Sequence, residues 1–216
     1  MDPTPAPRDF VMPLGVFIMK DENGHVFQPH EGFRKYDVTS EAFKAQYAVV
    51  CSAEGLEQLF LALARTCFSE TVYAIIEYYS TGEKETSQLE SYLSPFIEIA
   101  TVVAVFKSYM FQLNNDGQVA FGLAWQEGKR REEVFIDDHK VITVMTSQVH
   151  TVAGLLLDAG LTESEGLEFV SQHAHGHLNL TAVANLGADS DLAKVIGTRE
   201  AGYVHDIIKK LNMKRQ

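Results

Sequence analysis

The chain has 216 residues, of which 46% are hydrophobic, 10% are aromatic and 22% are charged. This composition excludes wholesale disorder, and the length is sufficient to bury a hydrophobic core. Lysine and arginine number 18 against 29 aspartate and glutamate residues, so the formal net charge is −11 at pH 7. Because a negative field repels phosphate groups and anionic lipids, we expect neither a nucleic-acid partner nor a membrane partner.

The N-terminal region is predicted to be an arm followed by a hairpin. Residues 1–12 contain three of the six prolines and little apolar content, which is typical of an extended arm. Residues 16–19 and 25–27 are apolar runs on either side of Asn23-Gly24, a dipeptide that favours the positive φ of tight hairpin turns. We expect residues 13–216 to form a single α+β domain, with a weak boundary near residues 82–88.

A strand, a helix and a second strand are predicted to follow. Residues 47–51 form a short apolar run, and Ser52 is of a type that caps helices. Residues 71–79 are apolar on both faces except at Glu77, so we expect both faces of this strand to be covered. The apolar stripe of the intervening helix is Leu56, Leu59, Phe60 and Leu63.

The middle of the chain is predicted to form a helix at residues 86–99 and then an antiparallel meander. Residues 101–146 are rich in β-branched and aromatic side chains and contain turn sequences at residues 114–117 and 137–140. We therefore expect four consecutive strands, with an edge strand able to pair with a partner. The predicted strands are residues 101–113, 118–126, 133–136 and 141–146.

Two helices complete the predicted fold. One begins at Ser147 and stops at Gly160, a residue type that ends helices in the left-handed conformation. The other is capped by Thr198 and buries an apolar face near the C-terminus. The sequence therefore indicates an α+β fold: an antiparallel β-meander at about residues 101–146 with flanking helices, extended by an N-terminal hairpin and a β-α-β stretch.

The segment His173-Ala174-His175-Gly176-His177 is the most unusual local feature of the sequence. Residues two apart share one face of an extended strand, so these imidazoles would align roughly 7 Å apart. Two of them could bind one divalent metal ion together with a third ligand from a neighbouring strand. Since neutral imidazole is a common ligand for zinc, copper and nickel, the sequence predicts a candidate site for zinc or another divalent transition metal at His173, His175 and His177. A solvated histidine-rich loop is the alternative.

Two further places carry residue types that support chemistry. Asp137-Asp138-His139 sets two carboxylates beside an imidazole, which suits acid/base catalysis or cation binding, although hairpin turns also favour aspartate. Cys51 precedes a predicted helix, where the pKa of a thiol can be lowered; a buried, unreactive cysteine is the alternative.

Function is predicted mainly from the charge and from missing motifs. The chain has two cysteines and lacks a secretory signal pattern at its start, so we expect free thiols and a cytoplasmic location. No GxGxxG, GxxxxGK[ST], GxSxG or HExxH motif occurs. These features favour a non-enzymatic interaction protein (a regulator, inhibitor, adaptor or assembly subunit) with a protein partner or self-association. The alternatives are a metal-binding protein or metal-dependent enzyme using the histidine cluster, and an enzyme or small-ligand binder with a site between sheet and helices.

Overall fold

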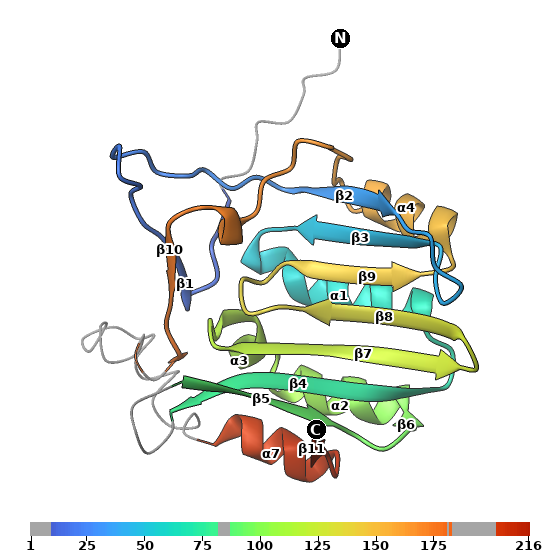
Figure 1. The fold of residues 1–216 in the computed structure, drawn as a ribbon. Helices are drawn as coiled ribbons and strands as arrows, with labels where there is room; N and C mark the ends of the chain where they lie inside the picture. The colour runs from blue at the N-terminus through green and yellow to red at the C-terminus, as the bar shows by residue number, and fades with distance from the viewer. Residues whose placement is uncertain (1–9, 82–86, 181, 183–201) are drawn as a thin grey trace.

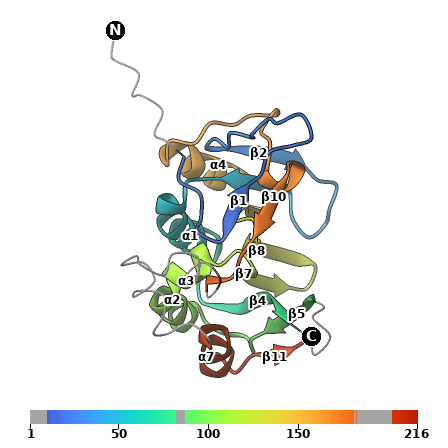
Figure 2. The same ribbon diagram turned by 90° about the vertical axis from the view of Figure 1, so that its left-hand side faces the viewer.

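The computed structural model describes residues 10–81, 87–180, 182 and 202–216. In these residues, one large antiparallel sheet carries helices on one face, and a separate two-stranded sheet lies at its end (Figure 1 and Figure 2). The helices are α1 (Ala53–Cys67), α2 (Ile99–Ser108), α3 (Met110–Asn115), α4 (Val149–Asp158) and α7 (Tyr203–Lys210), with a 3-10 turn η1 (Val170–Gln172).

The large sheet has nine strands in the described residues. They are β2 (Gly32–Asp37), β3 (Ala45–Val50), β4 (Thr71–Thr81), β5 (Ser87–Leu93), β6 (Ile97–Glu98), β7 (Val119–Glu127), β8 (Arg130–Ile136), β9 (Ile142–Thr146) and β11 (Lys214–Arg215). Their order across the sheet is β11-β5-β4-β7-β8-β9-β3-β2, and β6 pairs with one end of β4.

The main hydrophobic core lies between the large sheet and the helices. Alternate side chains of each strand face the helices, and in β7 these are the buried residues Val119, Phe121 and Leu123. The ring of Phe60 on α1 packs edge-on against Phe121, with 5.1 Å between the ring centroids. Since burying one side chain of this size contributes about 1.5–3 kcal/mol, this layer is the main source of stability.

The predicted α+β class is confirmed, and the meander has three strands rather than four. β7, β8 and β9 are consecutive antiparallel neighbours. Residues 101–113, predicted to be the first strand, instead form α2 and α3, so that prediction is wrong. Val102, Phe106 and Met110 recur every four residues and are buried in the main core. This helical spacing outweighs the β-branched composition of the segment.

The helix predicted at residues 86–99 is also wrong. Most of this segment is β5, which pairs with β4 from Ile75 opposite Leu93 to Thr81 opposite Ser87. Pairing satisfies the backbone groups along one edge of β4. The helix propensity of the segment does not include the free energy of pairing with a distant strand. The pairing with β4 therefore overrides that propensity.

The predicted β-α-β stretch is present as β3, α1 and β4, but its two strands are not neighbours. β9, β8 and β7 lie between them in the sheet. The expectation that both faces of β4 are covered is wrong for the face away from the helices. Tyr73, Ile75 and Glu77 are only half-buried there, whereas Ala74 and Ile76 are fully buried on the helix side.

The predicted pairing within the N-terminal hairpin is replaced by a pairing between two segments that lie far apart in the sequence. β1 (Val16–Ile18) pairs antiparallel with β10 (His175–His177). Residues 25–27, the expected partner of β1, contribute the isolated bridge between Lys20 and Val26, although the tight turn is present, with φ of 81° at Gly24. We call β1 and β10 together the ribbon; it stands at one end of the large sheet, beside the β8–β9 turn (Figure 1).

The edges of the large sheet are partly occupied. At β2, the Phe33 amide donates to the carbonyl of Thr162, and the Ser164 amide donates to the carbonyl of Phe33. At the other edge, β11 pairs with β5. Because each meander strand has a neighbour on both sides, the expectation of a free meander edge is wrong.

The two closing helices are present as α4 and α7. Gly160 ends the α4 segment with φ of 83°, as predicted. The expected cap of the C-terminal helix, Thr198, lies outside the described residues, as do residues 1–9 of the predicted arm and residues 82–86 of the predicted boundary.

Candidate metal centre

Three imidazoles meet where the ribbon contacts the β8–β9 turn. His175 and His177 lie two residues apart on β10, and His139 comes from the turn. One ligand nitrogen from each ring can be chosen so that all three lie within 4.8 Å of one another. The Nε2 atoms of His139 and His175 are 3.0 Å apart. The structure therefore supplies the third histidine from a part of the chain far from the cluster.

The β8–β9 turn is shaped by its own polar groups. Asp137 accepts hydrogen bonds from the Val141 amide through Oδ1 (2.8 Å) and from the Lys140 amide through its carbonyl (3.1 Å). Lys140 adopts φ of 65°, a left-handed conformation that costs a residue with a side chain about 1–2 kcal/mol. Its side chain is buried, and Nζ donates to the carbonyl of Val119. Such a conformation in a non-glycine residue is found where the surroundings fix it, and here it lies next to His139.

The second nitrogen of each imidazole is held by an acceptor. Nδ1 of His139 lies 2.9 Å from Oδ1 of Asp138, and Nδ1 of His175 lies 2.7 Å from the carbonyl of His173. Nδ1 of His177 lies 2.5 Å from the carbonyl of Gly117. When Nδ1 donates its proton to such an acceptor, the lone pair of a neutral ring is on Nε2. This is how metal-binding histidines are oriented in proteins.

The carbonyl of Gly117 is positioned by a close crossing of three backbone segments. The Gly117 amide donates to the carbonyl of Leu178, the Leu178 amide donates to the carbonyl of Gly15, and the Gly15 amide donates to the carbonyl of Asn115. A Cβ atom on Gly117 would lie 2.0 Å from the Gly15 oxygen, so this approach requires glycine. The crossing fixes the ribbon against the α3–β7 turn.

The carboxylates of the turn set the charge of the site. The hydrogen bonds and charges of Asp137 and Asp138 raise the pKa of His139 to about 9. Burial, the largest influence on His177, lowers its pKa. Burial alone would raise the pKa of Asp138, but its hydrogen bond to His139 and the charges of His139 and His177 lower it. Without a metal ion, His139 is therefore a cation paired with Asp138 at neutral pH.

The spacing of one donor pair fits a divalent transition metal ion, and all three ligand atoms lie within 4.8 Å of one another. Zinc–imidazole bonds are about 2.0–2.1 Å long, so two Nε2 atoms 3.0 Å apart, as in His139 and His175, would subtend an angle of about 90° at the ion. Small shifts of the rings would bring this angle to the tetrahedral value. Oxygen-preferring ions such as calcium and magnesium are a poor match for three nitrogen donors.

The other predicted site residues lie apart from this group. The ring of His173 stacks on Phe27 with 3.8 Å between centroids, and its Nε2 is 3.8 Å from Oε1 of Glu168. Cys51 is buried, and burial together with the charge of Glu31 raises its pKa to about 12, so it is a neutral thiol. Its position therefore does not favour nucleophilic catalysis.

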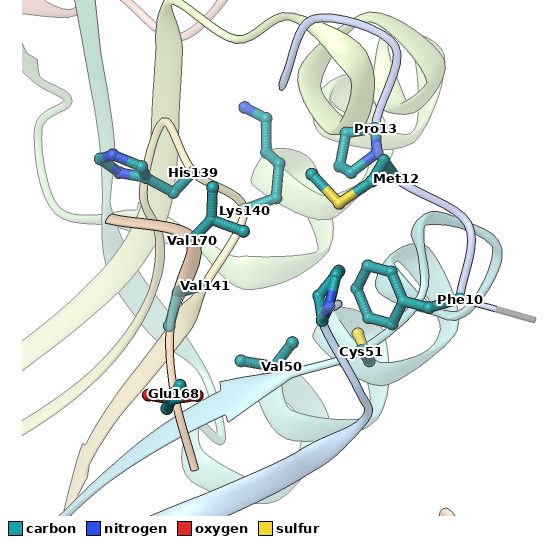
Figure 3. Close-up of a pocket in the computed structure, with 11 residues that line it drawn as sticks. Phe10, Met12, Pro13, Val50, Cys51, His139, Lys140, Val141, Glu168 and Val170 are labelled. Carbon is teal, nitrogen blue, oxygen red and sulfur yellow. The ribbon is translucent and has the colours of Figure 1, made fainter. Parts of the chain in front are cut away.

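A small pocket lies beside the turn (Figure 3). Phe10 and Met12 lie on one side of it, Val141 and Val170 lie on the other, and the ring of His139 is at its margin and turned away (Figure 3). The pocket has room for about one water molecule. It is therefore too small for an organic substrate.

Sequence reasoning found the histidine cluster and, separately, the Asp137–His139 segment, but did not join them. The expected third ligand from a neighbouring strand had no residue assigned to it. The sequence did not predict that the Gly117 carbonyl orients His177 or that Lys140 adopts a left-handed conformation. A glycine or a lysine in a turn has no sequence pattern that indicates such a role.

The fold and the site define a class of protein in structural terms: a large antiparallel sheet with one helical layer and a three-imidazole centre at its end. Comparison with protein-family models, with curated proteins and with solved structures found no match in any of the three. In the described part of the chain, no helix has both the length and the apolar character required to cross a bilayer.

Proposed function

We propose that this protein binds a divalent transition metal ion, zinc in the first instance, through Nε2 of His139, His175 and His177. The observation that carries the proposal is that all three rings are held through Nδ1 by fixed acceptors, while one ligand nitrogen from each ring lies within 4.8 Å of the other two. Such outer acceptors are a general feature of metal-binding histidines and raise the basicity of the ligand. A solvated histidine-rich loop gives no reason for this common orientation.

The donor set narrows the choice of metal. Three imidazoles without a thiolate suit zinc, copper(II), nickel and cobalt, whereas copper(I) and iron–sulfur clusters prefer sulfur ligands. The two cysteines, Cys51 and Cys67, are buried free thiols outside this group. Which of these ions occupies the site depends on their availability in the cell. We name zinc first for this reason.

The test is metal binding by single histidine variants. His139→Ala, His175→Ala and His177→Ala are each expected to weaken zinc binding more than about 100-fold, because losing an outer acceptor alone costs about 10–100-fold. The matched control is His173→Ala, which keeps the backbone carbonyl that orients His175 and is expected to bind zinc with the affinity of the natural chain. Isothermal titration calorimetry measures the affinity, and circular dichroism checks that each variant is folded.

Two results would contradict the proposal. One is that the natural chain binds less than one zinc ion per molecule even at zinc concentrations well above those that fill a physiological site. The other is equal zinc affinity in His139→Ala and in the natural chain, which would move any binding away from the β8–β9 turn.

We also propose an interaction role, which a different observation favours. Five of the large apolar side chains that are at least one-third exposed lie within residues 11–26, on the ribbon and its flanks. A concentration of exposed apolar side chains favours a protein partner or self-association. These residues are Val11, Leu14, Phe17, Met19 and Val26.

Light scattering after size exclusion tests self-association. We expect an oligomer for the natural chain and a monomer for Met19→Asp, because a charge in an apolar interface leaves an unpaired ion on association. A natural chain that remains monomeric at high concentration would count against self-association. The cytoplasmic location stays a prediction, and it agrees with the two free thiols.

A further inference from the structure

We infer that a metal ion in this centre keeps an exchangeable coordination position, which takes water, hydroxide or a small monodentate anion. The inference rests on the proposed function and goes beyond it, because it assigns a ligand-exchange role to the site. Structural zinc sites are closed by four protein ligands, whereas reactive sites have three protein ligands and an open position. Three observations favour the open kind.

First, the site is built without help from a metal ion. The ribbon is held in place by the backbone hydrogen bonds of Gly15, Gly117 and Leu178, and Val16 of β1 is buried. Each imidazole is oriented by its own acceptor. A structural metal ion supplies folding energy to a site that is otherwise unformed. Here the fold supplies the arrangement, so a metal ion is not needed as a cross-link.

Second, the described residues bring together three imidazole ligand atoms, while the carboxylates of Asp137 and Asp138 lie at the Nδ1 side of His139. Asp138 bonds to Nδ1 of His139, on the other side of the ring from Nε2. Oδ1 of Asp137 is occupied by the amide of Val141. Both carboxylates therefore contact the Nδ1 side of an imidazole, and the inner set consists of three imidazole nitrogens, which are neutral once they bind a metal ion. Zinc and cobalt take at least four ligands, so one or more come from elsewhere.

Third, access and charge favour a small anionic ligand. The side chains of His139 and His177 are each 19% exposed, so solvent reaches the rings. Neutral ligands leave the full charge of a divalent ion in place, and the adjacent Asp138 offsets only part of it. Hydroxide, azide and thiocyanate match this size and charge.

The test uses the full chain loaded with cobalt(II), whose visible absorption responds to each change of ligand. Cobalt binding is measured first, by stoichiometry and by comparison of the natural chain with His139→Ala. Azide and thiocyanate are then titrated separately into the loaded protein. We expect a shift of the absorption bands that saturates at one anion per cobalt, with the cobalt retained on dialysis. The His173→Ala control is expected to show the same shift.

The possible failures are distinguishable. If one cobalt binds per chain and requires His139, but neither anion changes the spectrum, a further group of the protein closes the site. The exchangeable position is then wrong, and the proposed metal binding stands. If cobalt does not bind, or binds equally well to His139→Ala, both proposals fail together.

Discussion

The helix-covered sheet and the ribbon are stabilised by different kinds of interaction. In the sheet, Phe121 and Leu123 of β7 are fully buried against the helices. In the ribbon, Val16 is buried but Phe17 is 40% exposed, and Met19, which follows β1, is 45% exposed. Backbone hydrogen bonds to the α3–β7 turn hold the ribbon instead. The sheet depends on apolar burial, and the ribbon depends on polar pairing and close backbone packing.

This difference shows why a site can form at the ribbon and not in the core. A metal ligand needs a donor atom that is directed by hydrogen bonds and reached by solvent. Apolar burial gives more free energy but covers donor atoms. The two regions should therefore respond differently to mutation and to pH.

The largest expected effect is in the sheet. Phe121→Ala should lower the free energy of unfolding by about 3–5 kcal/mol, because it leaves a cavity beneath Phe60 and Phe106. Urea denaturation measures this loss. Zinc affinity, measured where the variant is still folded, should stay at the natural value. A parallel loss of zinc affinity would show that the two regions are not independent.

A smaller effect is expected at the backbone crossing. Gly117→Ala sets a Cβ atom 2.0 Å from the Gly15 oxygen and should cost about 1–3 kcal/mol of stability, as overpacking does. Because the Gly117 carbonyl orients His177, zinc affinity should fall as well. The control is Gly154→Ala on α4, where the added Cβ meets no atom within 4 Å and helix propensity favours alanine by about 1 kcal/mol. Unchanged zinc binding in folded Gly117→Ala would contradict this role of the crossing.

The smallest effect is a pH dependence confined to the ribbon end. The pKa of His139 is raised to about 9, so below that pH the ring carries a proton on the nitrogen that the metal needs. Zinc affinity should therefore rise about tenfold, or 1.4 kcal/mol, from pH 7 to pH 8 and level off near pH 9. About one proton should be released per zinc at pH 7, measured by calorimetry in two buffers with different ionisation enthalpies. Binding without proton release would mean that His139 is neutral or is not a ligand.

Several parts of the fold were determined by local sequence. The apolar stripe of α1, the β8–β9 hairpin around residues 137–140 and the stop of α4 at Gly160 all follow from spacing and turn chemistry. The extended conformation of residues 175–177 was also predictable, since Gly176 disfavours a helix. Apart from the pairing partner of residues 175–177, these features follow from residue types that lie close together in the chain.

The tertiary structure decided the rest. β5 is a strand because it pairs with β4, and the ribbon joins two segments that lie far apart in the sequence. For the same reason, His139 meets His175 and His177 only after the sheet and the ribbon have formed. The spacing of residues along the sequence does not predict that these three histidines lie close together. Their proximity depends on long-range strand pairing and on the close backbone approach that Gly15 and Gly117 permit.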